Sequence, residues 1–190
     1  MSLYYSIVKN LLKTSMSLAE IQSTTGSSLP TVRRAVQALS DARWIRVVGQ
    51  AEADGGRPAM LFGIHNESSM ILGLHLQLPG MQITATDLSG KVLETIEFFS
   101  GTVPEPSEVV RAVVDIVQIL KARFPDRRVL GIGIAAPGYI DPHTGDIIAI
   151  GRVPSWVNFP ICQRLYEATG LPVQIANDVD CLAIAELNFD

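Results

Sequence analysis

The chain has 190 residues, 47% of them hydrophobic, and a formal net charge of −4, so it can bury the core of one ordinary domain plus a small one. Its apolar runs all fall short of the roughly 18 residues that a membrane helix needs, and its first residues lack a signal-peptide cleavage site. We therefore expect no membrane partner and a cytoplasmic location. Cys162 and Cys181 lie far apart in the sequence. We expect ordinary free thiols, with a disulfide as the alternative.

Charge is distributed unevenly along the chain. Residues 1–64 carry seven Lys and Arg against four acids, a net charge of +3. Residues 65–190 carry eight Lys and Arg against fifteen acids, a net charge of −7. A basic segment joined to an acidic body fits contact with nucleic-acid phosphates by the first segment only.

Three helices are predicted in the first forty residues. Ile7, Val8, Leu11 and Leu12 form an apolar stripe for the first helix. The second begins at the capping box Ser17-Leu18-Ala19-Glu20 and ends at Gly26. The third follows the predicted cap Ser28, tolerates Pro30 in its first turn, and buries a stripe formed by Val32, Ala35, Val36 and Leu39. A helix, a short glycine turn and a second helix are typical of DNA-binding motifs.

The outward face of the third helix is polar and cationic. A short helix of this kind suits the major groove of DNA, and its predicted contacts are Ser28, Thr31, Arg33, Arg34 and Gln37. Residues 44–48 and 59–64 then alternate as two strands, joined by a loop with Gly49, Asp54, Gly55 and Gly56. We interpret this hairpin as the wing of a winged helix-turn-helix domain over residues 1–64, with Arg57 reaching a minor groove. The alternative is a solvated helix face and a hairpin-end cation.

Residues 65–190 predict a different architecture. Three strand-like runs at 71–78, 81–88 and 91–99 are separated by glycine turns and indicate a β-meander. A helix with a valine-rich face at 109–120, a buried strand at 129–134, a helix around Leu165, a strand at 173–176 and a helix at 179–187 follow. Antiparallel strands followed by alternating helix and strand predict a ribonuclease-H-like lobe, so the chain combines α+β and α/β parts.

Specific motifs in this second part carry a family resemblance. The run Gly131-Ile132-Gly133-Ile134-Ala135-Ala136-Pro137-Gly138, extending to Gly145, resembles the glycine-rich signature of the ROK family (repressors, open reading frames, kinases). The segments 154–160 and 171–178 follow in the family's order. Its repressor branch, which includes N-acetylglucosamine, glucose and xylose repressors, also begins with a winged helix closed by a Gly-Arg-Pro loop, as at Gly56-Arg57-Pro58. The resemblance implies that residues 65–190 are the first lobe of an actin-like sugar-kinase fold.

One family motif is altered in this chain. Family kinases hold ATP phosphates and magnesium with an Asp-x-Gly-Gly-Thr turn, whose position here falls on His75-Leu76-Gln77-Leu78-Pro79. The acid, both glycines and the hydroxyl are replaced, and Pro79 removes an amide donor. Phosphoryl transfer depends on such groups, so we expect no kinase activity.

The sugar-binding motif is better preserved. The resemblance implies that Asn177 binds sugar hydroxyls and that Asp178 accepts a hydrogen bond from one, with Gly138 allowing close approach and Asn158 as a further contact. Helix capping before Val179 is the alternative role of the Asn-Asp pair. Asp180 is expected in the first helical turn, where an acid favours the helix dipole.

The histidines and cysteines show no metal-ligand spacing, so no cofactor is expected in this chain; the family's zinc site lies in a second lobe. We interpret the sequence as a fragment that ends where that lobe begins, with a protein naturally reduced to one lobe as the alternative, and expect it to bind sugar weakly. The leading interpretation is a repressor with operator DNA, a sugar or sugar-phosphate effector and a second copy of itself as partners. The alternatives are a sugar kinase with an accessory domain and a protein-binding regulatory module.

Overall fold

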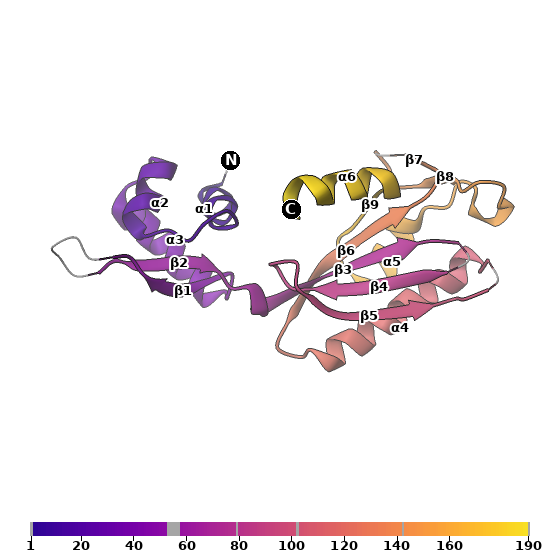
Figure 1. Ribbon diagram of the computed structural model, residues 1–190, viewed down its shortest axis with the longest axis horizontal. Helices are drawn as coiled ribbons and strands as arrows, with labels where there is room; N and C mark the ends of the chain where they lie inside the picture. The colour runs from indigo at the N-terminus through magenta and orange to yellow at the C-terminus, as the bar shows by residue number, and fades with distance from the viewer. Residues whose placement is uncertain (1, 53–57, 79, 102, 142, 190) are drawn as a thin grey trace. The chain divides into compact units, whose positions relative to one another are not determined.

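The computed structural model describes residues 2–52, 58–78, 80–101, 103–141 and 143–189 (Figure 1). Backbone contacts divide the chain into two compact units, Met1–Ser68 and Ser69–Asp190. The division falls at Ser68, beyond the expected boundary at Ile64, because a short 3-10 turn, η1 (Asn66–Ser68), packs with the first unit. We describe each unit by itself.

The amino-terminal unit places helices before a hairpin. Its helices are α1 (Leu3–Leu11), α2 (Leu18–Thr25) and α3 (Leu29–Asp41), and its strands β1 (Ile45–Gln50) and β2 (Met60–Ile64) pair in antiparallel fashion. Met16 adds an edge to this sheet, since it exchanges backbone hydrogen bonds of 2.9 and 2.8 Å with Phe62. Gly49 was expected in the loop but belongs to β1, because a bulge between Val47 and Gly49 extends the strand.

The core of this unit follows the predicted α3 stripe. Val32, Ala35, Val36 and Leu39 are all buried, and Ile7, Leu11, Met16, Ile21, Ile45, Phe62 and Ile64 complete the core. The capping box of α2 is also confirmed, with the Ser17 N–H donating to the Glu20 carboxylate at 2.7 Å and the Ser17 hydroxyl accepting from the Glu20 N–H at 3.3 Å. Leu12 is wrongly predicted: it is 61% exposed because α1 ends at Leu11.

The carboxy-terminal unit is built on a five-stranded sheet in the order β5-β4-β3-β6-β9. Strands β3 (Ser69–Leu76), β4 (Met81–Thr86) and β5 (Val92–Phe98) form the predicted antiparallel meander. Strands β6 (Arg128–Ala136) and β9 (Val173–Asn177) add to it in parallel. This is the strand order of a ribonuclease-H-like lobe.

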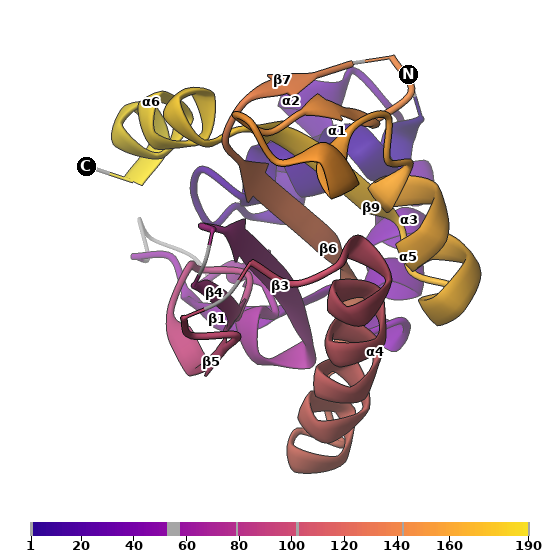
Figure 2. The same ribbon diagram turned by 90° about the vertical axis from the view of Figure 1, so that its right-hand side faces the viewer.

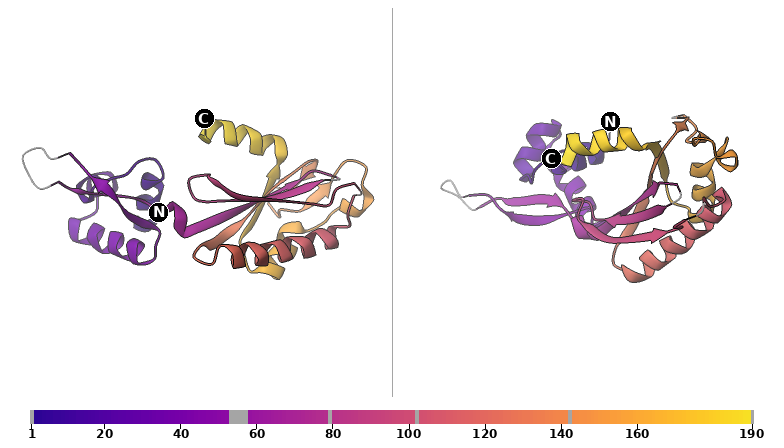
Figure 3. Two further views of the ribbon diagram at one scale, coloured as in Figure 1. Left: turned by 60° about the horizontal axis from the view of Figure 1, so that its bottom comes forward. Right: turned by 45° about the vertical axis from the view of Figure 1, so that its right-hand side comes forward.

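Helices cover the two faces of this sheet unequally. α4 (Pro106–Arg123) and α5 (Ile161–Thr169) pack against each other on one face and bury its apolar side chains (Figures 1 and 2). α6 (Asp178–Phe189) lies on the opposite face (Figure 3) and contacts mainly β9 and β6. Its apolar side chains are largely exposed, and Leu187 has 84% of its surface accessible.

A small hairpin follows β6 and shapes the glycine-rich segment. β7 (Tyr139–Ile140) pairs with β8 (Ile147–Ala149), and the 3-10 turn η2 (Pro154–Trp156) follows. Trp156 anchors this region because it is fully buried and its indole N–H donates to the Pro104 carbonyl at 3.1 Å. Within the described ranges, no helix combines the length and apolar character needed to cross a membrane.

Candidate functional sites

The start of α3 differs from the prediction in one detail. Ser28 occupies the N-cap position, but its hydroxyl makes no capping bond to a backbone amide. Instead its oxygen lies 2.8 Å from the hydroxyl oxygen of Thr31. The neighbouring Pro30 has no N–H to offer, so the two hydroxyls satisfy each other. Both residues are exposed and remain able to bond to an external acceptor.

The cationic face of α3 is available to a ligand. Arg33 and Arg34 are exposed, and neither guanidinium forms an ion pair with another residue that the structure describes. Gln37 is also exposed, but its amide nitrogen donates to Asp41 at 2.7 Å, one helical turn further on. The two arginines therefore present free donors for phosphate or base edges, while Gln37 already uses one N–H in an internal bond.

The hairpin beside α3 is described except at its tip. The Ala51 N–H donates to the Ala59 carbonyl at 2.8 Å and extends the pairing of β1 and β2 toward the tip. Arg57, the predicted minor-groove residue, lies outside the described residues, as do Asp54, Gly55 and Gly56. Its role stays a prediction.

In the second unit, Gly138 occupies a position that requires glycine. Its φ is +92°, and a Cβ added there would lie 2.2 Å from the carbonyl oxygen of Ala149 and 3.1 Å from the Cα of Ile150. Both the positive φ and the close approach of β8 exclude a side chain. The β7–β8 hairpin therefore approaches closely at this turn, and Gly138 itself is exposed.

The Asn-Asp pair lies next to this turn. The Asn177 side-chain amide donates to the Gly138 carbonyl at 3.1 Å, and its oxygen accepts from the Val179 N–H at 3.0 Å. Asp178 accepts from the same N–H through one carboxylate oxygen at 2.9 Å. The capping geometry weighed from the sequence is thus present. The second oxygen of Asp178 has no hydrogen-bond partner among the residues that the structure describes, so it remains a charged acceptor.

Asn158, the fourth residue predicted for a sugar site, lies in a bend beside β8. It has a φ of +52°, and its backbone N–H donates to the Ile148 carbonyl in β8 at 3.1 Å. Its side chain is exposed and makes no hydrogen bond to a described residue. Gly138, Asn177 and Asp178 are therefore brought together by hydrogen bonds, whereas Asn158 approaches only through the β7–β8 hairpin.

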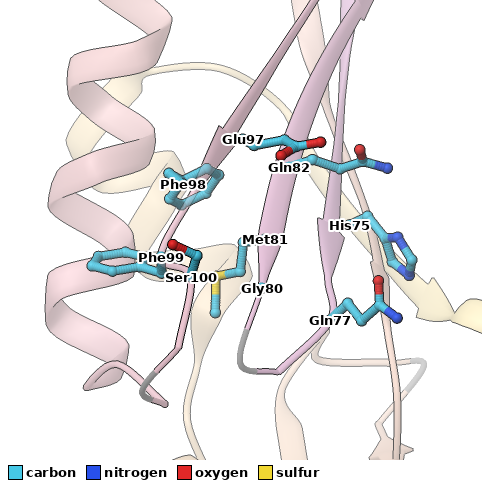
Figure 4. A pocket seen from close by; sticks show the side chains of 9 residues that line it. All are labelled: His75, Gln77, Gly80, Met81, Gln82, Glu97, Phe98, Phe99 and Ser100. Atoms are coloured by element: carbon cyan, nitrogen blue, oxygen red, sulfur yellow. The ribbon is translucent and has the colours of Figure 1, made fainter.

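In the altered motif, His75 and Leu76 are the last residues of β3, and Gln77 and Leu78 follow the strand. Leu76 points into the core and is fully buried, His75 is half-buried, and Pro79 lies outside the described residues. Beside this segment is a hollow of about 450 Å³ lined by nine residues (Figure 4): His75, Gln77, Gly80, Met81, Gln82, Glu97, Phe98, Phe99 and Ser100. Among the described residues that line it there is no Lys, Arg or Asp. Gln82 and Glu97 were missed from the sequence, although their alternation with buried residues in β4 and β5 is a signal of one shared face.

The cysteines are free and show no metal-ligand grouping. Burial, together with the nearby Asp146 carboxylate, raises the pKa of the Cys162 thiol to about 11. Burial also raises the pKa of the half-buried Cys181. Within the described ranges, His, Cys, Asp and Glu side chains form no group of three or more that could hold a metal ion.

Comparison with known proteins places this geometry in a family. A transcriptional regulator of Mycobacterium tuberculosis is 33% identical over 175 residues, covering 88% of this chain and 38% of its own. The xylose repressor of Caldicellulosiruptor bescii is 25% identical over 162 residues, covering 84% of this chain and 40% of its own. The chain thus spans less than half the length of these relatives.

Solved structures show the same fold. The crystal structure of a ROK family transcriptional regulator, a homologue of the E. coli MLC protein, superimposes with a TM-score of 0.73 over 98% of this chain and 47% of its own, at 23% identity. ROK hexokinase from Thermus thermophilus matches with a TM-score of 0.53 over 62% of this chain and 38% of its own, at 28% identity. The ROK family model matches residues 76–190. This chain therefore belongs to the ROK family.

Proposed function

We propose that this chain acts in a sugar-responsive transcriptional repressor of carbohydrate metabolism. In this proposal residues 1–64 form a winged helix-turn-helix that binds operator DNA, and residues 65–190 form the first lobe of a sugar-kinase-like domain that senses the effector. The repressor works as a homodimer in the cytoplasm and has no kinase activity. Relatives that are named transcriptional regulator and xylose repressor support this assignment over an enzyme.

The observation that carries the proposal is the asymmetry of α3. The apolar face of this helix is buried in the core, while Arg33 and Arg34 on the opposite face form no ion pair with a described residue. Two adjacent free guanidiniums on a well-anchored helix, next to an exposed serine–threonine hydroxyl pair, match the donors that phosphates and guanine edges accept. The adjacent β1–β2 hairpin, with Arg57 in its loop, supplies the wing.

The sugar side of the proposal rests on the turn at Gly138. The Asn177 amide donates to the Gly138 carbonyl, and the neighbouring Asp178 keeps one carboxylate oxygen with no hydrogen-bond partner among the described residues. A charged acceptor and a carboxamide next to a glycine turn suit the adjacent hydroxyls of a sugar ring. Asn158, whose backbone N–H donates to Ile148 in β8, is the fourth residue of the proposed site.

The absence of kinase activity is proposed from the turn after β3. A nucleoside triphosphate needs backbone amides, cations or a magnesium ligand around its phosphates. The described lining of the hollow beside this turn contains neither a cation with a fixed charge nor an aspartate, and the carboxylate of Glu97 faces the same space. Repulsion by this charge disfavours a phosphate chain.

DNA binding tests the proposal directly. A duplex selected from a randomised pool by the chain serves as the probe, and binding is followed by fluorescence anisotropy. We expect Arg34→Ala to weaken binding roughly tenfold to a hundredfold, because one base-specific arginine contact is typically worth about 1–3 kcal/mol. Arg57→Ala should also weaken it.

Arg111→Ala is the matched control. It removes the same charge from an exposed position of α4 in the other unit and should leave DNA affinity unchanged. Equal affinities of the parent, Arg34→Ala and Arg57→Ala would contradict the assignment of α3 and the hairpin as the DNA-binding surface.

A further inference from the structure

Three polar side chains follow one another along the exposed face of α3. Arg34, Gln37 and Asp41 are spaced by three and four residues, so they lie on the same side of the helix. All three are exposed, whereas Val36 and Leu39 on the opposite side are buried. The row therefore runs from the part of α3 proposed to enter the major groove to the last residue of the helix, Asp41.

The hydrogen bond between Gln37 and Asp41 fixes the direction of the Gln37 amide. The Gln37 Nε2 donates to the Asp41 Oδ1 at 2.7 Å. An ionised carboxylate only accepts hydrogen bonds, so it holds the NH₂ group of the amide and not its oxygen. The amide oxygen is therefore turned away from Asp41. It stays available to an external partner, together with the second N–H of the same amide.

One acceptor beside one donor is the set that adenine complements in the major groove. Adenine presents the N7 acceptor and the N6 amino donor there, and a glutamine amide engages both. Thymine offers this amide only an acceptor and cytosine only a donor, so each would use half of it. Guanine presents two acceptors, which match the guanidinium of Arg34. That guanidinium forms no ion pair with a described residue.

The spacing of Arg34 and Gln37 matches a single base step. Three residues of α-helix rise about 4.5 Å along the axis. Successive base pairs of DNA are about 3.4 Å apart, so one step fits this rise better than two steps of about 6.8 Å. The two side chains therefore reach neighbouring base pairs.

A similar bond in α5 shows what distinguishes the bond in α3. The Gln163 Nε2 donates to a Glu167 carboxylate oxygen at 2.8 Å, also across one exposed turn. Pairs of this kind are ordinary stabilising contacts on a helix surface. The position three residues before Gln163 holds Pro160 and not a cation. In α3 the same bond stands directly beside a guanidinium with no ion-pair partner among the described residues.

We infer that Gln37 reads an adenine next to a guanine read by Arg34, and that Asp41 is the residue that positions Gln37. The operator half-site then contains a G·C pair adjacent to an A·T pair. This inference rests on the proposed binding of operator DNA by α3 and specifies the bases that the helix selects. Asp41 does not touch the bases and acts only through the Gln37 amide.

Selection of duplexes from a randomised pool by the chain, followed by sequencing, measures the preference at each base pair. We expect a guanine and an adenine at neighbouring pairs. Gln37→Ala should reduce the preference for the adenine roughly tenfold to a hundredfold, the usual worth of a bidentate base contact, and leave the preference for the guanine unchanged. Arg34→Ala should do the reverse. Gln163→Ala, the matched control in α5, should change neither.

Variants of Asp41 test the positioning role. Asp41→Ala should lower the preference for the adenine about twofold to tenfold, because an amide that is no longer held must be ordered on binding. The loss of a negative charge affects all duplexes alike and cancels in the ratio of affinities. Asp41→Glu should restore the preference, since Glu167 accepts the same bond from Gln163. A purely structural role would weaken all duplexes equally and leave the ratio unchanged.

The outcomes separate this inference from the proposed function. If Gln37→Ala leaves every base preference unchanged, or if the two selected pairs are not neighbours, the assignment of bases is refuted, while a loss of binding in Arg34→Ala still supports DNA binding by α3. An adenine preference that is unaltered in Asp41→Ala refutes the positioning role. If the chain selects no duplex, the DNA-binding proposal and this inference both fail.

Discussion

Replacement of Gly138 by alanine tests the geometry of the proposed sugar site most directly. The added Cβ would lie 2.2 Å from the Ala149 carbonyl oxygen, well inside any real contact, and would sit on a backbone with a φ of +92°. Neither atom can yield cheaply, because the Ala149 carbonyl belongs to β8 and Gly138 is held by the Asn177 side chain. The β7–β8 hairpin must therefore move.

The loss of stability expected for Gly138→Ala has two parts. A left-handed backbone conformation costs a non-glycine residue about 1–2 kcal/mol. Forcing a methyl group into an occupied position typically costs about 1–3 kcal/mol. We therefore expect Gly138→Ala to lower the free energy of unfolding of the carboxy-terminal unit by roughly 2–5 kcal/mol.

Gly151→Ala separates these two parts. Gly151 has a φ of +53°, but an added Cβ there meets nothing within 4 Å, so only the backbone penalty of about 1–2 kcal/mol applies. Urea denaturation followed by Trp156 fluorescence, in a Trp44→Phe background, reports on the carboxy-terminal unit alone. If Gly138→Ala destabilises this unit no more than Gly151→Ala does, the close approach of β8 is refuted.

Three further predictions concern ionisable groups. The pKa of the Cys162 thiol is raised to about 11, so in a Cys181→Ser background this thiol should react with a disulfide reagent about a hundredfold more slowly at pH 8 than a free cysteine does. The reaction rate should keep rising with pH up to about pH 11. A rate that levels off below about pH 9 would contradict this. The Ser17 N–H lowers the pKa of Glu20, so its capping contact stabilises the folded state above the unfolded-state pKa and is lost as pH falls through the lower folded-state pKa. The difference in unfolding free energy between the parent and Glu20→Ala, about 1 kcal/mol at pH 7, should thus shrink in acid. Glu67→Gln should change stability by less than about 1 kcal/mol, because its ion pair with Arg46 at 3.1 Å is half-exposed; a larger loss would show that the pair fixes the end of the hairpin.

Local patterns predicted much of this fold because they depend on neighbours in the sequence. The apolar period of α3 identified its four buried residues, and the Ser-x-x-Glu pattern identified the capped start of α2. Ser28 shows where such reasoning stops. Its hydroxyl had two local partners, the helix amides and Thr31, and a sequence pattern does not rank them. The bulge that draws Gly49 into β1 likewise depends on pairing across the hairpin.

Features set by distant residues were not predictable. The hydrogen bond between Asn177 and Gly138 joins positions 39 residues apart, and only the parallel pairing of β6 with β9 brings them together. Glu97, Gln82 and His75 lie in a row that depends on the register of three strands, in which a shift by one residue would turn a side chain to the other face. The family resemblance identified Gly138 and Asn177 as single positions but not the hydrogen bond between them. Of the three residues in the row, it identified only His75.

The structural and ligand-binding roles proposed for Asn177 are compatible because a carboxamide has more bonding capacity than the fold uses. Its NH₂ group carries two donors, of which the Gly138 carbonyl takes one, and its oxygen carries two acceptor sites, of which the Val179 N–H takes one. One donor and one acceptor remain, the set that a sugar hydroxyl engages as both acceptor and donor. The bonds inside the protein hold the amide in a fixed orientation before the ligand arrives, which reduces the ordering cost of binding. Helix capping is therefore a reason to expect this asparagine to bind well, and not an alternative to its binding a sugar.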